Sequence, residues 1–205
     1  MVRKDNDKNI IDILYAHYKD SFEKILSKEK LRDRLFFLVI FLLGLIVIEY
    51  RYSIEILSAI SELNVVGLKI KLNQLPLPVI LSTTWTIFFG ILLRYYQITL
   101  DIDKKYSYLH NLESRISKKI GVSSKLFDRE SASYLTHKGK FFRYWAWIFY
   151  TAAFPIIILA VIIILIWLEI NSSEIQLEHR IYDLVLAVFC IGTVIFYLIG
   201  IWFNR

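Results

Sequence analysis

The chain has 205 residues, of which 56% are hydrophobic and 21% are charged, and its formal net charge is +6. An ordinary soluble domain rarely has so high an apolar content. Apolar and charged residues also fall into separate blocks, which is typical of a membrane protein. The only cysteine, Cys190, lies in an apolar run, so the sequence offers no intrachain disulfide and no evidence for an oxidising compartment.

Residues 1–34 form a charged segment without a visible cleavable signal peptide, so the apolar run that follows should be a retained span. Apolar side chains recur in this segment at alternating steps of four and three residues, at Ile11, Tyr15, Tyr18, Phe22 and Ile25. That spacing predicts a cytosolic amphipathic helix with a heptad-like seam.

Four apolar runs predict an all-α polytopic membrane protein with four transmembrane helices. We assign the spans to residues 35–52, 77–96, 144–168 and 184–205, and the external loops to residues 53–76 and 169–183. The first apolar stretch is short against the usual length of roughly 17–25 residues, but Tyr50 and Tyr52 fit an interfacial aromatic belt. The first external loop should hold a brief extended pair near Val65 and Lys69, and Pro155 should kink the third span.

The distribution of lysine and arginine predicts the orientation of these spans. Nine such residues precede Leu35 and ten lie within residues 97–143, against two and one in the external loops. The positive-inside rule therefore places both termini and residues 97–143 in the cytoplasm. Topology and anionic lipid account for the positive net charge, and a surface for an acidic ligand is the alternative.

The second span continues into a charged but still patterned helix. No proline lies between Pro78 and Ile120, and at about 1.5 Å per residue such a helix is about 65 Å long, roughly twice the bilayer core. Its cytosolic half carries a second apolar stripe, followed by Gly121 as a C-cap: Ile98, Ile102, Tyr106, Leu109, Leu112, Ile116 and Ile120. We expect this stripe to pack against the N-terminal helix and to contribute to oligomer contacts. A membrane-surface role for the N-terminal helix is the alternative.

Small and polar residues of the second span fall within about a third of the helix circumference, at Ser82, Thr86, Gly90, Arg94 and Gln97. In a symmetric oligomer this face could line a water-filled path, with Arg94 forming a ring at the cytosolic mouth. The alternative is plain helix packing, in which small residues allow close approach and hydroxyls bond to their own backbone.

The cytosolic cations, with interleaved rings, are candidates for binding a nucleotide or an oligonucleotide. The candidate residues are Lys104, Lys105, Tyr108, His110, Arg115, Lys118, Lys119, Lys125, Arg129, Lys138, Lys140 and Arg143. No glycine-rich phosphate loop accompanies them, so a solvated charged face is the alternative interpretation.

Acidic residues stand at the ends of three apolar runs. Glu49 lies beside Arg51, and Glu169 and Asp183 end the third run and precede the fourth, so we interpret them as markers of the membrane interface. His110 and Glu113 alone do not make a metal site. Because no nucleophile elbow, Walker loop or HExxH helix is present, we expect no enzyme activity, no metal and no cofactor.

Three short segments resemble those of small bacterial four-span proteins. They are Arg94-Tyr95-Tyr96-Gln97, then Lys105-Tyr106-Ser107-Tyr108-Leu109-His110-Asn111-Leu112-Glu113, and Asp128-Arg129-Glu130 with Tyr134-Leu135. In size and layout such proteins are similar to the membrane subunits of anti-phage systems such as Hailong and Kiwa. The resemblance covers about the central third of the chain. It implies an oligomeric effector of the bacterial inner membrane that stays closed until a cytosolic signal changes.

The leading hypothesis is a homo-oligomeric channel effector of anti-phage, abortive-infection defence, gated from the cytosol by a nucleotide or nucleic-acid-derived signal. The alternative is a membrane sensor or scaffold that recruits a soluble, neighbour-encoded partner without conducting ions. A small transporter subunit is disfavoured, because the chain lacks the broken helices and internal symmetry of one.

Overall fold

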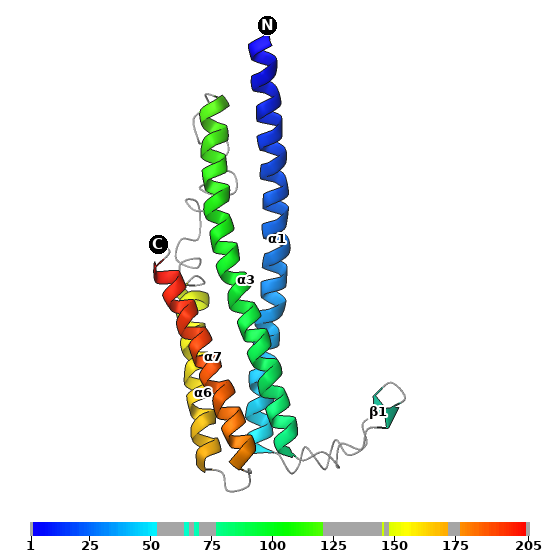
Figure 1. Cartoon of the computed structure of the whole chain (residues 1–205), viewed down its shortest axis with the longest axis vertical. Coiled ribbons are helices and arrows are strands. Elements are labelled where there is room, and N and C mark those ends of the chain that lie inside the picture. Colours follow the sequence, from blue (N-terminus) through cyan, green and yellow to red (C-terminus); the bar gives the residue numbers. More distant parts are fainter. Residues whose placement is uncertain are drawn as a thin grey trace. The chain divides into compact units, whose positions relative to one another are not determined.

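The computed structural model of the chain describes residues 2–52, 64–65, 68–69, 77–120, 145, 148–171 and 177–203. These residues form four α-helices, α1 (Val2–Arg51), α3 (Leu77–Ile120), α6 (Phe154–Asn171) and α7 (Leu177–Phe203) (Figure 1). The prediction of an all-α fold is confirmed. The brief extended pair is present as two antiparallel strands of two residues each, β1 (Asn64–Val65) and β2 (Leu68–Lys69).

The chain divides into two compact units, and both α1 and α3 contribute residues to each of them. Unit 1 comprises Met1–Asp33 and Gln97–Tyr150, and unit 2 comprises Arg34–Tyr96 and Thr151–Arg205. The N-terminal amphipathic segment and the first apolar run belong to one uninterrupted helix, α1. The long second helix is confirmed as α3.

Three helices in the described part of the chain are long and apolar enough to cross a membrane: Pro78–Lys119, Phe149–Asn171 and Leu177–Ile201. Helix α1, with its apolar run Leu35–Ile48 of 14 residues, is not among them. A crossing by α1 and the cytoplasmic position of the termini stay predictions.

The interior of unit 2 is an apolar helix bundle. Its fully buried side chains come from all four helices and include Val39, Ile46, Trp85, Phe88, Leu92, Ile158, Ile162, Ala187, Cys190 and Val194. Aromatic rings also pack against one another between helices: the ring centroids of Phe36 and Phe154 are 4.7 Å apart, and those of Tyr96 and Tyr197 are 4.1 Å apart. The buried positions of each helix recur at three- and four-residue steps, which sets the face that each helix turns inward.

The outside of unit 2 is apolar as well. Phe37 on α1, Trp167 on α6 and Phe196 on α7 are all more than 60% exposed. A helix that is apolar on every side suits a lipid environment, since a soluble protein rarely exposes contiguous apolar surface of this extent. The exposed apolar faces therefore agree with the membrane character of the three long apolar helices.

A turn of π-helix, η3 (Phe149–Ala153), directly precedes α6. Pro155 is the second residue of α6, and its ring nitrogen cannot donate to the carbonyl of residue 151, four positions earlier. A widened turn is one of the recognised ways in which a helix accommodates such a defect. A π-helical turn thus lies just before Pro155, and the kink predicted there stays a prediction.

Unit 1 contains a helix pair formed by the N-terminal part of α1 and the C-terminal part of α3. The predicted stripe on α3 is buried at Ile98, Ile102, Leu109, Leu112 and Ile116, and Ile25 of α1 is fully buried. Polar bonds join the two helices, from the Tyr18 hydroxyl to Glu113 Oε1 at 3.0 Å and from the Tyr106 hydroxyl to Glu29 Oε1 at 3.0 Å. The predicted packing of these two helices is confirmed.

Candidate functional site

The residues predicted to form a pore face on α3 differ in their exposure. Ser82 is buried inside unit 2, whereas Thr86 is exposed. The Thr86 hydroxyl donates to the Ser82 carbonyl at 2.8 Å and lies 3.0 Å from the Tyr182 hydroxyl. The back-bonded hydroxyl is the arrangement expected for plain helix packing, so Thr86 is exposed but its proton is already engaged.

Further along α3, Gly90, Arg94 and Gln97 are exposed, the last of them in unit 1. A Cβ added to Gly90 would meet no atom within 4 Å. No close contact within the described residues therefore requires a glycine at position 90. Unit 2 thus carries an exposed polar stripe, which we define as Thr83, Thr86, Gly90 and Arg94 of α3.

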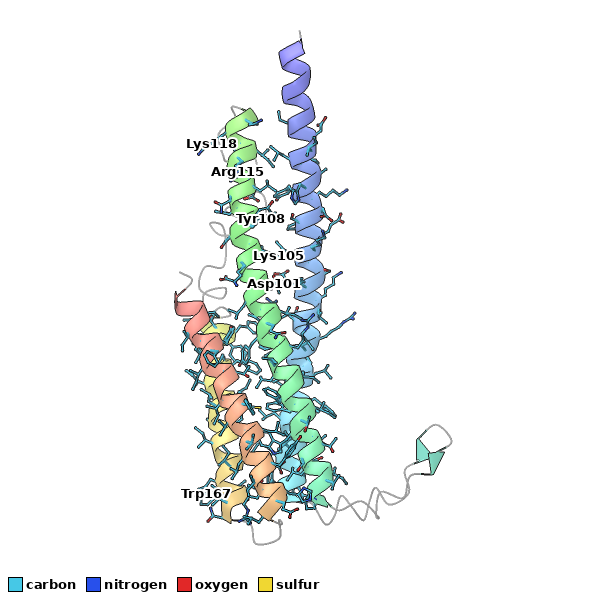
Figure 2. The ribbon with its side chains drawn as sticks, in the orientation of Figure 1. Asp101, Lys105, Tyr108, Arg115, Lys118 and Trp167 are labelled. Carbon is cyan, nitrogen blue, oxygen red and sulfur yellow. The ribbon has the colours of Figure 1, made fainter. Side chains whose placement is uncertain are left out.

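The basic candidates that the structure describes follow the exposed side of α3 in unit 1 (Figure 2). Exposed members are Lys104, Tyr108, His110, Arg115, Lys118 and Lys119, and Lys105 is half-buried. Lys125, Arg129, Lys138, Lys140 and Arg143 lie outside the described residues. The described part of the set thus presents six exposed basic or aromatic side chains to solvent, so a polyanion has access to it.

One of these cations, Lys105, interacts with charged groups that include Lys28 of α1. The Lys28 ammonium pairs with the Asp101 carboxylate, and this hydrogen bond lowers the pKa of Asp101 below its ordinary value. Lys28 also lowers the pKa of Lys105, because the positive charge of one ammonium group disfavours the protonated form of the other, whereas Asp101 acts in the opposite direction. Asp101 thus offsets part of the positive charge here, and the free excess of charge lies nearer the end of α3.

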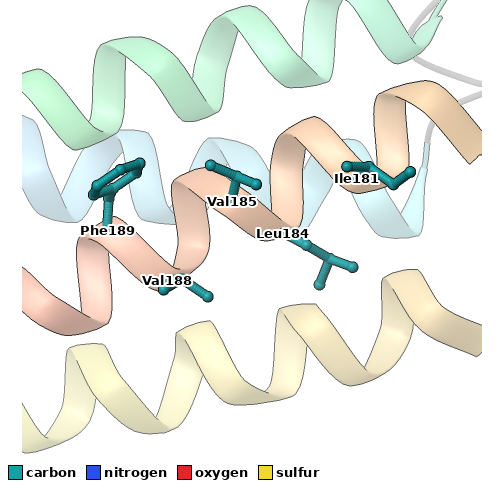
Figure 3. A pocket seen from close by; sticks show the side chains of 5 residues that line it. All are labelled: Ile181, Leu184, Val185, Val188 and Phe189. Atoms are coloured by element: carbon teal, nitrogen blue, oxygen red, sulfur yellow. The ribbon is translucent and has the colours of Figure 1, made fainter.

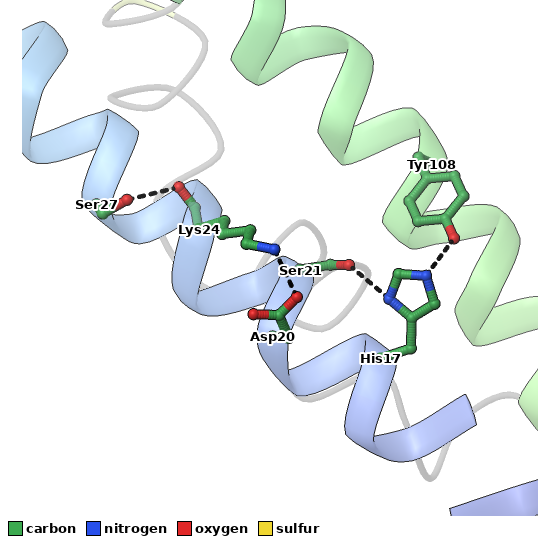
Figure 4. A network of polar contacts seen from close by, with 6 residues as sticks. All are labelled: His17, Asp20, Ser21, Lys24, Ser27 and Tyr108. Carbon is green, nitrogen blue, oxygen red and sulfur yellow. Dashed lines mark hydrogen bonds and ion pairs between the residues drawn. The ribbon is translucent and has the colours of Figure 1, made fainter. Parts of the chain in front are cut away.

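Tyr108, the ring proposed to stack on a base, is engaged by α1. Its hydroxyl lies 3.3 Å from His17 Nε2, and Ser21 Oγ lies 3.4 Å from His17 Nδ1 (Figure 4). The Tyr108 and His17 rings are tilted by 53° with centroids 6.0 Å apart. Tyr108 is therefore part of the contact between the two helices of unit 1 as well as partly exposed.

His110 Nδ1 lies 3.6 Å from Glu113 Oε2, and Glu113 is buried and accepts the bond from Tyr18. Among the described residues, no group of three or more histidines, cysteines, aspartates or glutamates is arranged to hold a metal ion. The polar role of Glu113 in this structure is to anchor the helix pair.

An open apolar depression lies along α7, lined by Ile181, Leu184, Val185, Val188 and Phe189 (Figure 3). All five side chains are hydrocarbon, so the depression offers a polar ligand no bonding group. It belongs to the apolar exterior of unit 2.

The acidic residues interpreted as interface markers are buried within unit 2. We define the carboxylate layer as Glu49, Glu169 and Asp183, of which the first is 8% exposed and the other two are 0% exposed. Thr84 Oγ1 donates to Glu49 Oε1 at 3.0 Å, and the Tyr50 hydroxyl donates to Glu169 Oε2 at 2.7 Å. The Arg51 side chain lies outside the described part. The carboxylate layer is the site that sequence reasoning missed.

A signal for the carboxylate layer was present in the spacing. On α6 the buried positions are Ile158, Ile162, Leu165 and Glu169, at steps of four, three and four residues. Glu169 therefore continues the inward stripe of its helix by one position. Asp183 does the same on α7, four residues before buried Ala187.

No family model, curated protein or solved structure matches this chain. The resemblance to anti-phage membrane subunits stays a prediction.

Proposed function

We propose that this chain is the subunit of a homo-oligomeric membrane channel that crosses the bilayer four times with both termini in the cytoplasm. The observation that carries the proposal is the polar stripe of α3. Exposed positions on α6 between Ile156 and Ile170 are all apolar, whereas α3 exposes Thr86, Gly90 and Arg94 alongside apolar residues such as Ile87 and Leu93. An arginine and a bare glycine gain little from facing lipid, so a second copy of the chain or water should face them.

Contacts in unit 2 support a fourth crossing by α1. The Phe36 and Tyr95 rings are 6.3 Å apart, and Glu49 bonds to Thr84, so this part of α1 lies antiparallel to the apolar part of α3. Phe36 to Glu49 spans about 20 Å at 1.5 Å per residue. A segment this short crosses if the bilayer thins locally or flanking residues extend to the interface.

The continuous helices suggest how a cytosolic signal would reach the channel. α3 carries both the polar stripe in unit 2 and the exposed cations of unit 1, including Arg115 and Lys118. A nucleotide or oligonucleotide bound by those cations would bias the helix pair between two arrangements. The anti-phage setting, in which opening arrests an infected cell, is part of this proposal and rests on the resemblance.

Ion flux through liposomes that contain the purified full chain tests the proposal. Thr86→Leu and Arg94→Ala should change the flux, and Arg94→Lys should retain most of it. Thr193→Leu is the matched control, because the Thr193 hydroxyl also bonds to its own helix, at Phe189, but lies on α7. Absence of flux in the wild type, with and without an oligonucleotide in the buffer, would overturn the channel.

The sensor or scaffold is a second candidate, favoured by the back-bonded hydroxyls of α3. Thr83 donates to the Val79 carbonyl at 2.7 Å and Thr86 to the Ser82 carbonyl, as expected of helices that pack without a water-filled path. Purified protein that binds a neighbour-encoded soluble protein, yet conducts no ions, would select this candidate.

A further inference from the structure

Two carboxyl groups in unit 2 are completely withdrawn from solvent. Glu169 on α6 and Asp183 on α7 are both 0% exposed. Within the described part of the chain, Glu169 Oε1 and both Asp183 oxygens accept no hydrogen bond of normal geometry. A buried carboxylate that is ionised and has no hydrogen-bond donor strongly destabilises the folded state. Some compensating group is therefore required at these oxygens.

The two carboxyl groups lie close enough to interact: the charge of Asp183 acts on Glu169, and the two groups are within hydrogen-bonding range of each other. Arg180 of α7 acts on Glu169, and His179 acts on Asp183. From α1, Tyr50 donates to Glu169, while Glu49 is satisfied on one side by Thr84. Arg180 is thus one permanent positive charge that faces a pair of buried acids, and balance of a second negative charge would depend on His179.

The surrounding groups on α3 point to a ligand at the pair. Ser82 is 8% exposed, and its hydroxyl faces Asp183 without forming a hydrogen bond of normal geometry. Trp85 is fully buried, and its indole nitrogen likewise has no hydrogen-bond partner within the described residues. Unused donors and acceptors thus converge on one buried layer, which is unusual in a packed protein interior.

We propose that Glu169 and Asp183 form a proton-binding site, in which one proton is shared as a carboxyl–carboxylate pair. Two carboxylates in one apolar site do not both ionise readily, since each disfavours the charge of the other. A carboxyl O–H of one residue donates to an oxygen of the other, which gives each a bond that neither can make when both are ionised. No group of three ligating side chains in the described residues fits a metal ion, which favours the proton over a metal.

The shared proton would make the contact between α6 and α7 depend on pH. With the proton present, the pair carries one negative charge that Arg180 can balance. Without it, two buried like charges repel each other across the contact. This inference uses unit 2 alone and holds whether or not the protein conducts ions.

Infrared difference spectroscopy of the purified full chain in lipid nanodiscs tests the site directly. At about pH 7, where free carboxyls are ionised, the wild type should show the carbonyl stretch of one protonated carboxyl. Glu169→Gln combined with Asp183→Asn should remove that band. Glu49→Gln, a change in the same carboxylate layer, should leave it. A missing band in the wild type, as expected if His179 supplied the balancing charge, or a spectrum that the double change leaves the same, would overturn the proposal.

Thermal unfolding gives a second measurement that needs no spectral assignment. The wild type should lose stability as the pH rises above about 4, where the carboxyls of the unfolded chain ionise, by up to tenfold in the unfolding constant per pH unit for one proton, until the folded pair gives up its proton. The double amide variant mimics the protonated pair and should show a smaller pH dependence. Stability that instead follows sodium concentration at fixed pH would overturn the proton in favour of a metal cation.

Discussion

Both units contain parts of α1 and α3, and unit 2 contains α6 and α7 as well, but the two units are held together in different ways. In unit 1, α1 and α3 bury one narrow apolar stripe and are joined by polar bonds such as Tyr18 to Glu113. In unit 2, four helices bury large apolar side chains and expose others of the same kind. Burial of apolar surface in water can drive the first arrangement, whereas packing complementarity matters more where the outside is also apolar. The difference predicts which substitutions each unit tolerates.

The largest loss of stability should come from a substitution that creates a cavity in the interior of unit 2. Trp85→Ala removes a fully buried indole and should reduce the free energy of unfolding by about 3–5 kcal/mol. Thermal unfolding in detergent micelles measures it. Trp167→Ala is the matched control, because Trp167 is 64% exposed and should change stability by less than about 0.5 kcal/mol. Equal losses from both would contradict the interior assigned to unit 2.

A somewhat smaller loss is expected from the stripe of unit 1. Ile116→Ala opens a cavity beneath a side chain that is 1% exposed and should cost about 2–4 kcal/mol locally. Hydrogen exchange of the α3 amides from 97 to 120 should report it. Ile13→Ala, at an exposed position of α1, should leave exchange unchanged. If the two variants exchange alike, the stripe does not hold the helices together.

Loss of one polar bond between the helices should have a moderate effect. Tyr18→Phe leaves Glu113 Oε1 without its 3.0 Å donor and should cost about 1–3 kcal/mol, because Glu113 is buried. Tyr108→Phe, which removes a longer bond to exposed His17, should cost less than about 0.5 kcal/mol. Protease susceptibility of residues 1–33 compares the two, and a reversed order would mean that Glu113 is not the anchor.

The smallest expected effect is a loss of stability of unit 1 at low pH. Lys24 lowers the pKa of Asp20, and Lys28 lowers that of Asp101, in each case mainly through a hydrogen bond to the carboxylate. A carboxyl whose pKa is lower in the folded state stabilises the fold above its unfolded pKa and loses that contribution as the pH falls through the folded pKa. Unit 1 should therefore loosen slightly towards about pH 3, and high salt should reduce the change further.

The same acid titration contrasts the units. The proposed shared proton of Glu169 and Asp183 makes unit 2 lose stability as the pH rises, the opposite direction. Hydrogen exchange resolved along the chain separates the two responses. Parallel pH responses of both units would contradict the contrast.

The α3 stripe was predictable because charged residues separate its apolar positions. Ile98, Ile102, Leu109, Leu112 and Ile116 are all buried as expected. Tyr106 fits the same period but is 39% exposed, since its hydroxyl reaches Glu29 at the rim. The periodicity identifies the face of the helix that is buried. It does not tell whether an amphipathic side chain such as that of Tyr106 lies at the centre of that face or at its edge.

The polar residues of unit 2 were harder to predict. In an apolar helix, every face looks equally suited to packing, so the sequence cannot tell which of Ser82 and Thr86 turns inward. The structure buries Ser82 and exposes Thr86. Glu169 and Asp183 stand near the ends of apolar runs and resemble span boundaries, yet the packing of neighbouring helices encloses both.

The π-helical turn η3 has a consequence for the length of the chain. A π-turn holds about one residue more than the α-turn it replaces, and one residue corresponds to about 100° of rotation. Deletion of one residue within Phe149–Ala153 would convert the turn to α-helix and leave the inward face of α6 as it is. Elsewhere in a helix the same deletion rotates everything that follows. The segment before α6 is thus a natural point at which this chain can gain or lose a single residue.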